Sequence, residues 1–374
     1  MLKALQEDEG VRRRLDRKDQ LSPAQIEDLK VLWVGGEGGI EIDLISQEKV
    51  EFTTIPAAGI HGVGLRNIPG NLWQIIKGFF SARRILKEFQ PQVLFFTGGY
   101  LAVPVALAGR SIFSRKNRPR IMVYVPDIEP GLALRFLAIV SDQIAVTVEE
   151  TMNYFSSQSK IEVTGYPVRS QLKIIEKTAA RLQLSLLKDI PTLLVFGGSK
   201  GARSINHAIL GVLQDLLKDI QVIHVSGHLD WSEIEDARKR LPTNLQVRYQ
   251  AFPYLYQEMG IAFSAADIVL SRAGAAVLGE FPMFAIPAIL VPYPYAWRYQ
   301  EVNARYLEDH GAAVVLQDDE LKEKLLPTIH DLLEDQTQRK RMSQAMLSLA
   351  TPKAAESIAG LLRGLVSAPS LGRI

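Results

Sequence analysis

The sequence predicts an α/β protein made of two doubly wound halves, each a parallel sheet covered by helices. Three observations predict this fold. Short apolar runs alternate with longer amphipathic patterns along most of the 374 residues. The apolar runs are hydrophobic on both faces, as strands buried in parallel sheets are. Several of them lead through glycine-rich turns into helical patterns, which is the order of a βα unit.

Ten apolar runs are predicted as strands, five in each half. Those of the first half are 30–34, 93–97, 121–125, 143–148 and 161–163. Those of the second half are 192–196, 221–226, 246–250, 268–271 and 288–292. The halves divide at the turn-rich GYPVR, near 166–170. We therefore expect one domain over 1–167, a second over 168–350, and a C-terminal helix with a tail over 351–374.

Composition excludes several classes of protein. The chain has no cysteine, so thiol nucleophiles, disulfides and zinc–cysteine sites are ruled out. Its 43 Lys+Arg against 41 Asp+Glu leave a net charge of +2, too balanced for a nucleic-acid partner. No stretch approaches the ~18 apolar residues of a membrane span, and the charged N-terminus is no signal peptide. We expect a cytoplasmic protein, with contact at the membrane surface still open.

The strongest local signal is LLVFGGSKGARSINHAIL at 193–210, where a buried strand runs through a glycine turn into an amphipathic helix. Such a turn directs free backbone N–H groups and the positive helix end at one point, which suits a phosphate. A tight turn that needs glycine only for its dihedral angles explains the pattern equally well. The turn is neither a Walker loop nor a G-x-G-x-x-G fingerprint.

A second glycine turn lies in VLSRAGAAVLGEFPMF at 269–284, with Glu280 about two turns into the helix that follows Gly274. A carboxylate there can accept two hydrogen bonds from a ribose diol, although an exposed helix glutamate is the commoner explanation. The two turns together favour a nucleoside diphosphate held by helix ends. No Asp-x-Asp pair is present to hold it through a metal. His224 and His228 flank a strand-to-loop junction, and we expect no metal site there.

The motifs GGSKGARSIN, SRAGAAVLGE and PAILVPYPYAWRYQEVNARYL occur in this order, with TGGYLAVPVALAG and GYPVR before them. In order and spacing they resemble the lipid II-forming N-acetylglucosaminyltransferases (MurG) of bacterial cell-wall synthesis, over about 30–350. The resemblance implies the GT-B fold, two Rossmann-like domains facing a central cleft. It implies inverting transfer of N-acetylglucosamine from UDP-GlcNAc to the C4 hydroxyl of undecaprenyl-diphosphate-MurNAc-pentapeptide (lipid I). It implies no required cofactor, and a peripheral place on the anionic inner leaflet of the cell membrane.

The resemblance also assigns site residues by position. Ser199 and its loop would meet the diphosphate, Glu280 the ribose hydroxyls, and Gln300 with Asn303 the donor sugar. Backbone groups near Leu255 and Tyr256 would pair with the uracil. The full donor-binding set is Arg169, Gly198, Ser199, Lys200, Gly201, Leu255, Tyr256, Gly274, Ala275, Ala276, Val277, Leu278, Gly279, Glu280, Gln300 and Asn303. The acceptor side would include Gly98, Gly99 and Tyr100.

The sequence departs from the family pattern at three places. Family members begin with a strand, a glycine loop holding Thr and His, and a helix. Here MLKALQEDEG is similar to the end of that helix, and GGEGG at 35–39 only imitates the loop. We therefore expect the first strand and loop to be missing, which leaves the first domain incomplete and the catalytic base unidentified. Asp127, in YVPDIEPG, replaces the Asn of a His-Glu-Gln-Asn run and either serves the acceptor hydroxyl or only orders its turn. Pro282 should kink or shorten its helix.

Residues 71–89, NLWQIIKGFFSARRILKEF, combine an apolar face with cations along its edge. This suits a helix lying on an anionic leaflet, and an amphipathic core-facing helix has the same pattern. The implied lipid-linked acceptor favours the membrane. A second basic cluster, RSIFSRKNRPR at 110–120, is a candidate to extend the contact.

Two other functions remain open from the sequence. One is a shortened, catalytically weak relative that binds UDP-GlcNAc without transferring the sugar. The other is a UDP-GlcNAc epimerase of the same fold.

Overall fold

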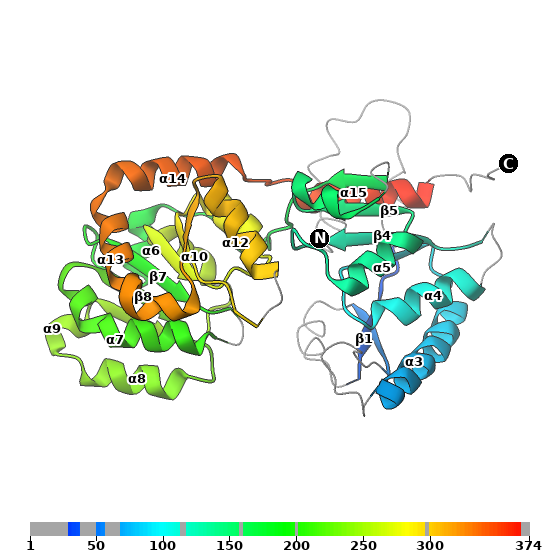
Figure 1. The fold of residues 1–374 in the computed structure, drawn as a ribbon, viewed down its shortest axis with the longest axis horizontal. Helices are drawn as coiled ribbons and strands as arrows, with labels where there is room; N and C mark the ends of the chain where they lie inside the picture. The colour runs from blue at the N-terminus through cyan, green and yellow to red at the C-terminus, as the bar shows by residue number, and fades with distance from the viewer. Residues whose placement is uncertain are drawn as a thin grey trace. The chain divides into compact units, whose positions relative to one another are not determined.

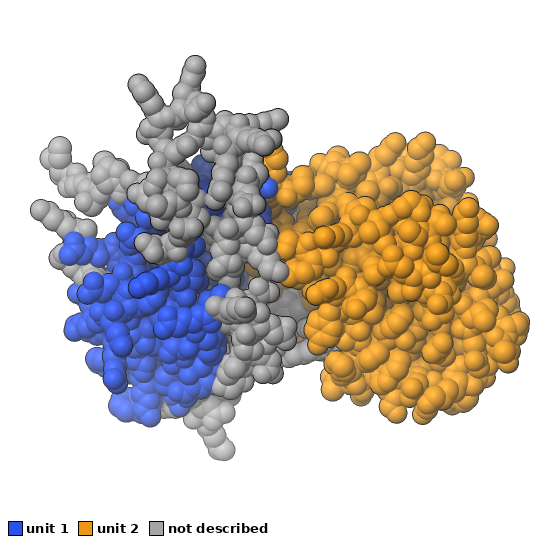
Figure 2. Space-filling model, turned by 180° about the vertical axis from the view of Figure 1, so that it is seen from behind, with its two compact units in different colours: residues 1–125, 130–164, 355–374 blue, residues 126–129, 165–354 orange. Residues whose placement is uncertain are grey.

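The computed structural model describes residues 29–37, 50–56, 68–112, 117–156, 160–198, 201–295 and 299–367 (Figure 1). The chain divides into two compact units (Figure 2). Unit 1 consists of residues 1–125, 130–164 and 355–374, and unit 2 of residues 126–129 and 165–354. The boundary after residue 164 lies next to the GYPVR segment. The predicted division did not place residues 126–129 in unit 2. It also did not place the C-terminal helix in unit 1.

Unit 2 is built on a six-stranded parallel sheet in the order β12-β11-β10-β7-β8-β9. Its strands are β7 (Thr192–Phe196), β8 (Gln221–Val225), β9 (Tyr249–Phe252), β10 (Ile268–Ser271), β11 (Ala288–Leu290) and β12 (Ala313–Val315). The chain builds outward from β7 on one side and from β10 on the other. Doubly wound folds bind ligands where two such strands meet, outside their carboxyl ends.

Helices cover this sheet because their apolar residues recur at helical spacing. In α7 (Arg203–Asp219), Ile205, Ile209 and Leu216 share one face and are fully buried against β7 and β8. The remaining helices of the unit are α6 (Lys177–Gln183), α8 (Trp231–Arg240), α9 (Thr243–Gln246), α10 (Met259–Ala265), α11 (Val277–Phe284), α12 (Tyr299–Asp309), η6 (Asp318–Glu320), α13 (Leu321–Glu334) and α14 (Gln336–Ser348).

Unit 1 contains two separate parallel sheets, β1-β2 and β3-β4-β5-β6. Its strands are β1 (Leu32–Gly36), β2 (Glu51–Ile55), β3 (Val93–Phe96), β4 (Arg120–Val125), β5 (Gln143–Val146) and β6 (Ile161–Val163). Its helices are α3 (Ile68–Phe89), α4 (Ala102–Ile112), α5 (Leu132–Val140), η4 (Glu149–Tyr154) and α15 (Ala354–Ser367). Ile55 of β2 belongs to the same apolar core as Leu94 of β3, so both sheets share that core.

The two units differ in how their sheets are divided. In unit 2 the first strand, β7, lies between β8 and β10 within one sheet. In the described part of unit 1 the strands form two separate sheets. The expectation that the first strand and glycine loop are missing stays a prediction.

The C-terminal helix α15 returns to unit 1. Its Ile358 is fully buried with Met122 and Tyr124 of β4 and Ala145 of β5, and Figure 1 shows the helix beside these strands. The sequence pattern predicts an amphipathic helix here, but its apolar face gives no information about which sheet it covers.

Most predicted strands lie within two residues of their observed bounds, and the exceptions have local causes. The strand predicted at 246–250 begins at Tyr249, because a turn of helix after Pro242 takes 243–246. Strands β2 and β12 were not predicted; three of the five residues of β2 are polar, and β12 is the short run AVV. Helix α11 is eight residues long, contains Pro282 and ends two residues after it.

Candidate functional site

Unit 2 contains a cavity of about 870 Å³ at the carboxyl ends of β7 and β10. Its walls are the turn after β7, the turn after β10, the beginnings of α7 and α11, and the segment around Tyr293. The cavity brings together seven residues predicted from the sequence: Gly198, Gly201, Gly274, Ala276, Val277, Glu280 and Gln300. Turns far apart in the chain therefore form one site because β10 pairs with β7.

The turn after β7 has its shape because two of its three glycines adopt a positive φ. Gly198 has φ +84° and Gly201 has φ +79°, values that side chains of L-residues rarely allow. A Cβ on Gly201 would also lie 2.3 Å from the carbonyl oxygen of Ser226. The close approach directs the chain into α7 at the cavity wall. Helix α11 begins at the same cavity, so two positive helix ends face it, as an anion site requires.

Glu280 is a buried carboxylate of the cavity, at 8% exposure. Its side chain Oε1 lies 3.5 Å from Nη2 of Arg169. Two residues of the predicted donor-binding set, Arg169 of the GYPVR segment and Glu280, therefore lie side by side. Burial raises the pKa of Glu280 above its ordinary value, and Arg169 opposes this. Tyr166 packs against Gly279, so Gly279 faces this ring, away from the cavity. Burial, together with the charges of Glu280 and Asp127, raises the pKa of Tyr166 to about 12.

Asn303 is fully buried and does not line the cavity. It donates one N–H to Oδ1 of Asp127 at 2.9 Å and the other to the carbonyl of Ala273 at 3.1 Å. Its own Oδ1 accepts the N–H of Ile128 at 3.2 Å. Both amide hydrogens are therefore used within the protein. The expected contact of Asn303 with the donor sugar stays a prediction. Burial raises the pKa of Asp127, and the hydrogen bond from Asn303 lowers it.

The remaining predicted residues lie in several places. Leu255 is buried, and Tyr256 is 61% exposed with its ring 4.5 Å from that of Tyr254; neither lines the cavity. Leu278 is buried in α11, and Ala275 lies between two lining residues. Ser199 and Lys200 are outside the described residues.

The predicted acceptor-side residues lie in unit 1. Gly98 and Gly99 have φ +120° and +83°, and with Tyr100 they form the turn between β3 and α4. The N–H of Ala102 donates to the carbonyl of Gly99 and closes this turn. These values explain why the sequence has two glycines there.

Sequence reasoning missed four charged residues of the cavity: Arg203, Asp230, Arg272 and Asp318. Nη1 of Arg272 lies 2.5 Å from Asp318 and its Nη2 donates to the hydroxyl of Ser204, which ties the two glycine turns together. Two of these residues had a signal in the sequence, since Arg203 and Arg272 directly flank the glycine turns. Asp230 and Asp318 had none, because their partners are distant in the chain.

A fully buried polar chain supports the first turn. His224 of β8 forms hydrogen bonds through Nδ1 with the hydroxyl of Tyr249 (2.8 Å) and through Nε2 with Oδ1 of Asn206 (3.0 Å). Burial lowers the pKa of His224 to about 3 and outweighs the charge of Asp230, which raises it. The ring is therefore neutral and both nitrogens are used. In the described residues no group of His, Asp and Glu side chains could hold a metal ion.

Two family models match this chain, and both describe domains of the same glycosyltransferase family. Residues 192–358 match the glycosyltransferase family 28 C-terminal domain, and residues 25–118 match the family 28 N-terminal domain. A protein of Roseiflexus sp. (strain RS-1) is 37% identical, the match covering 90% of this chain and 83% of the relative. A protein of Desulforamulus reducens is 36% identical, the match covering 88% of this chain and 89% of the relative. Both relatives are named UDP-N-acetylglucosamine–N-acetylmuramyl-(pentapeptide) pyrophosphoryl-undecaprenol N-acetylglucosamine transferase.

Solved structures are similar in fold. MurG of Acinetobacter baumannii superposes with a TM-score of 0.69 at 23% identity, over 91% of this chain and 92% of that one. The UDP-GlcNAc 2-epimerase of Neisseria meningitidis bound to UDP-GlcNAc gives 0.59 at 15% identity, over 90% and 100%. At these identities the likeness shows the fold alone. That fold is the predicted GT-B arrangement of two Rossmann-like domains.

Proposed function

The chain belongs to the family of the UDP-N-acetylglucosamine–N-acetylmuramyl-(pentapeptide) pyrophosphoryl-undecaprenol N-acetylglucosamine transferases (MurG), and from this we propose its reaction. The protein is a UDP-GlcNAc-dependent hexosyltransferase of peptidoglycan synthesis. It transfers N-acetylglucosamine from UDP-GlcNAc to lipid I and so forms lipid II. Neither the epimerase nor a binding protein without activity is better supported.

The observation that carries the proposal is the cavity between the two glycine turns. A nucleoside diphosphate needs an anion site beside a group that accepts hydrogen bonds from the ribose hydroxyls. The cavity supplies both. The N-terminal ends of α7 and α11 lie at its wall and form the anion site, and Glu280 in its lining is the hydrogen-bond acceptor. We place the diphosphate at the turn of Gly198 and Gly201, and the ribose at Glu280.

The reaction is a direct displacement at the anomeric carbon. The acceptor C4 hydroxyl oxygen forms a bond to this carbon while the bond from carbon to the β-phosphate oxygen breaks, which inverts the configuration. UDP leaves with the electron pair, and the positive helix ends stabilise the charge that develops on it. The hydroxyl proton passes to a base, for which Asp127 remains the candidate in this chain.

Replacing Glu280 with Ala should weaken UDP-GlcNAc binding about 10- to 100-fold, because a charged hydrogen-bond acceptor to the ribose is lost. Titration calorimetry measures this, and the half-exposed Glu235 of α8, replaced with Ala, is the matched control.

The full chain should convert a radiolabelled donor and a lipid I analogue into lipid II product. Turnover of UDP-GlcNAc to its 2-epimer without acceptor would contradict the transferase and favour the epimerase.

We also place the protein at the cytoplasmic membrane surface through α3. None of the helices in the described part of the chain is both long and apolar enough to span a membrane. Trp73, Ile76 and Phe80 are exposed on one stripe of α3, at 57%, 38% and 62%. On the opposite face Ala82 and Leu86 are buried in the core of unit 1. The helix therefore covers the core with one face and leaves a second apolar face free.

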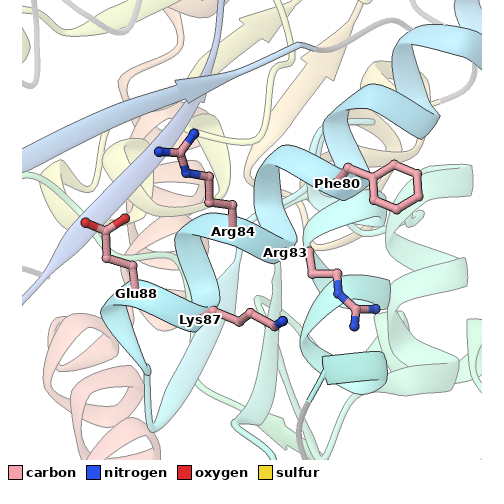
Figure 3. A pocket seen from close by; sticks show the side chains of 5 residues that line it. All are labelled: Phe80, Arg83, Arg84, Lys87 and Glu88. Atoms are coloured by element: carbon pink, nitrogen blue, oxygen red, sulfur yellow. The ribbon is translucent and has the colours of Figure 1, made fainter.

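Cations continue the exposed stripe. Figure 3 shows Phe80, Arg83 and Lys87 pointing the same way from α3, and with Arg84 and Glu88 they border a surface hollow of about 520 Å³. An apolar stripe that ends in cations fits the boundary between acyl chains and anionic headgroups. The second basic cluster stays a candidate for the same contact, although two of its arginines have a carboxylate partner within unit 1. Arg110 lies 2.8 Å and Arg120 3.6 Å from Asp142, so this carboxylate engages both guanidinium groups.

The triple change Phe80→Ser, Arg83→Glu and Arg84→Glu should weaken binding to vesicles containing phosphatidylglycerol at least tenfold, since each cation contributes roughly 1 kcal/mol near such a surface. Phe79 is left unchanged because it packs on the core. Co-sedimentation measures the effect, with Lys340→Glu and Arg341→Glu of α14 as the charge-matched control. Equal binding of both variants would place the membrane contact elsewhere.

A further inference from the structure

Arg203 is a cation of the cavity that no sequence motif assigned. It is the first residue of α7 and lines the cavity beside Gly201. Its Nε donates to Oδ1 of Asp230 at 2.8 Å, yet its side chain stays 69% exposed. Within the described residues its Nη1 and Nη2 groups have no hydrogen-bond partner. The guanidinium group is therefore held at one edge and open to the cavity at the other.

The anchor of Arg203 is itself fixed. Asp230 is 5% exposed and accepts from Arg203 on Oδ1 and from Nδ2 of Asn206 on Oδ2, the latter at 2.9 Å. Asn206 is fully buried and donates its other N–H to the carbonyl of Ser226 at 2.9 Å. Because both N–H groups of Asn206 are used, its Oδ1 must accept, and the donor is His224 Nε2–H.

The direction of the remaining hydrogen bond follows from this. A neutral His224 that donates from Nε2 accepts at Nδ1, so the hydroxyl of Tyr249 donates to it. One consistent set of donors and acceptors thus runs from β9 through β8 and α7 to Asp230. Such a chain permits a single arrangement, which orients Asp230 and hence Arg203 before any ligand binds.

Arg272, the other arginine of the cavity, has different surroundings. Its Nη1 interacts with Asp318 and with the carbonyl groups of Val291 and Pro292, and its Nη2 donates to Ser204. Its side chain is only 10% exposed. Arg272 therefore holds the wall of the cavity together, whereas Arg203 offers free donors to whatever occupies it.

We propose that Arg203, positioned by Asp230, binds the diphosphate of the donor nucleotide. This rests on the proposed function and adds a binding residue to its site. The planar guanidinium group can donate two parallel hydrogen bonds to phosphate oxygens, and the N–H groups of the adjacent helix start face the same region. As the bond to the anomeric carbon breaks, negative charge grows on the β-phosphate, so the same contact stabilises the leaving group.

The test compares nucleotides that differ only in their phosphates. Arg203→Gln should weaken UDP binding about 10- to 100-fold in titration calorimetry, as loss of a charged hydrogen bond does. Uridine binding, followed by competition, should change by no more than about twofold, since uridine has no phosphate. Arg203→Lys should recover part of the affinity because it keeps the charge but loses the planar pair of donors. The exposed Arg240 of α8, replaced with Gln, is the matched control and should bind UDP normally.

Asp230 provides an independent test of positioning. Asp230→Asn should weaken UDP binding in the natural chain but have no further effect in the Arg203→Gln background, because it acts through Arg203. UDP affinity unchanged in Arg203→Gln would overturn the proposal, and so would an equal loss of uridine and UDP affinity. If the unaltered chain itself binds no UDP, the proposed function fails instead, and that result is seen before any variant is made.

Discussion

Gly201→Ala should abolish UDP-GlcNAc binding and destabilise unit 2 by at least about 3 kcal/mol. Residue 201 has φ +79°, and a positive φ costs an L-residue roughly 1–2 kcal/mol. The added Cβ would lie 2.3 Å from the carbonyl oxygen of Ser226, so the backbone must move as well. Movement here displaces the start of α7, which lines the cavity. Urea denaturation and donor titration measure the two effects.

Gly198 provides the matched control, because it shares the strained conformation without the collision. Its φ is +84°, and a Cβ placed there would meet nothing within 4 Å. Gly198→Ala should therefore cost only the conformational strain, so it is the control for the loss of stability. If both variants lose stability equally, strain alone explains the loss and the contact with Ser226 has no part in it.

The free energy of unfolding should fall as the pH drops from about 6.5 towards 3, because of His224. Burial lowers its native pKa from 6.5 to about 3. In this window the unfolded chain binds a proton that the native protein does not, so stability is complete above pH 6.5 and is lost as the pH falls. The slope for one such group approaches about 1.4 kcal/mol per pH unit.

The groups around His224 do not reverse this sign. The hydroxyl of Tyr249 and the amide of Asn206 contact the ring, and the charge of Asp230 raises its pKa less than burial lowers it. Denaturation between pH 3 and 7 measures the slope, which should be shallower in His224→Gln. His207, half exposed beside Glu233, is the control, and His207→Gln should keep the full slope. A His224→Gln profile parallel to that of the natural chain would contradict the assignment.

Much of the site could be predicted from the sequence because its parts are local. A buried apolar run followed by glycines specifies a strand and a turn through interactions within about ten residues, and both turns of the cavity have this form. Glu280 was found for the same reason, since it follows the glycine turn closely in the sequence. The helix begins at Val277 and not at Gly274, so Glu280 lies in its first turn and not about two turns into it. The family motifs added the order of these parts.

Other features of the site depend on contacts that no local pattern encodes. Asn303 and Asp127 are 176 positions apart and meet only because the segment 126–129 packs in unit 2. Asn303 is thereby a buried amide whose two N–H groups are both used, which its position in the sequence does not reveal. Likewise, the apolar face of α15 predicts a helix without predicting its return to unit 1.

The sequence alone determined five of the six strands of unit 2, its glycine turns and the family to which the chain is similar. Periodicity, backbone conformation and motif spacing are properties of neighbouring residues. Only the tertiary structure decided which charges face the cavity. Arg203 and Arg272 have the same side chain and each adjoins a glycine turn, yet one is 69% and the other 10% exposed. The difference lies in their partners, Asp230 and Asp318, which reach them through the pairing order of the strands.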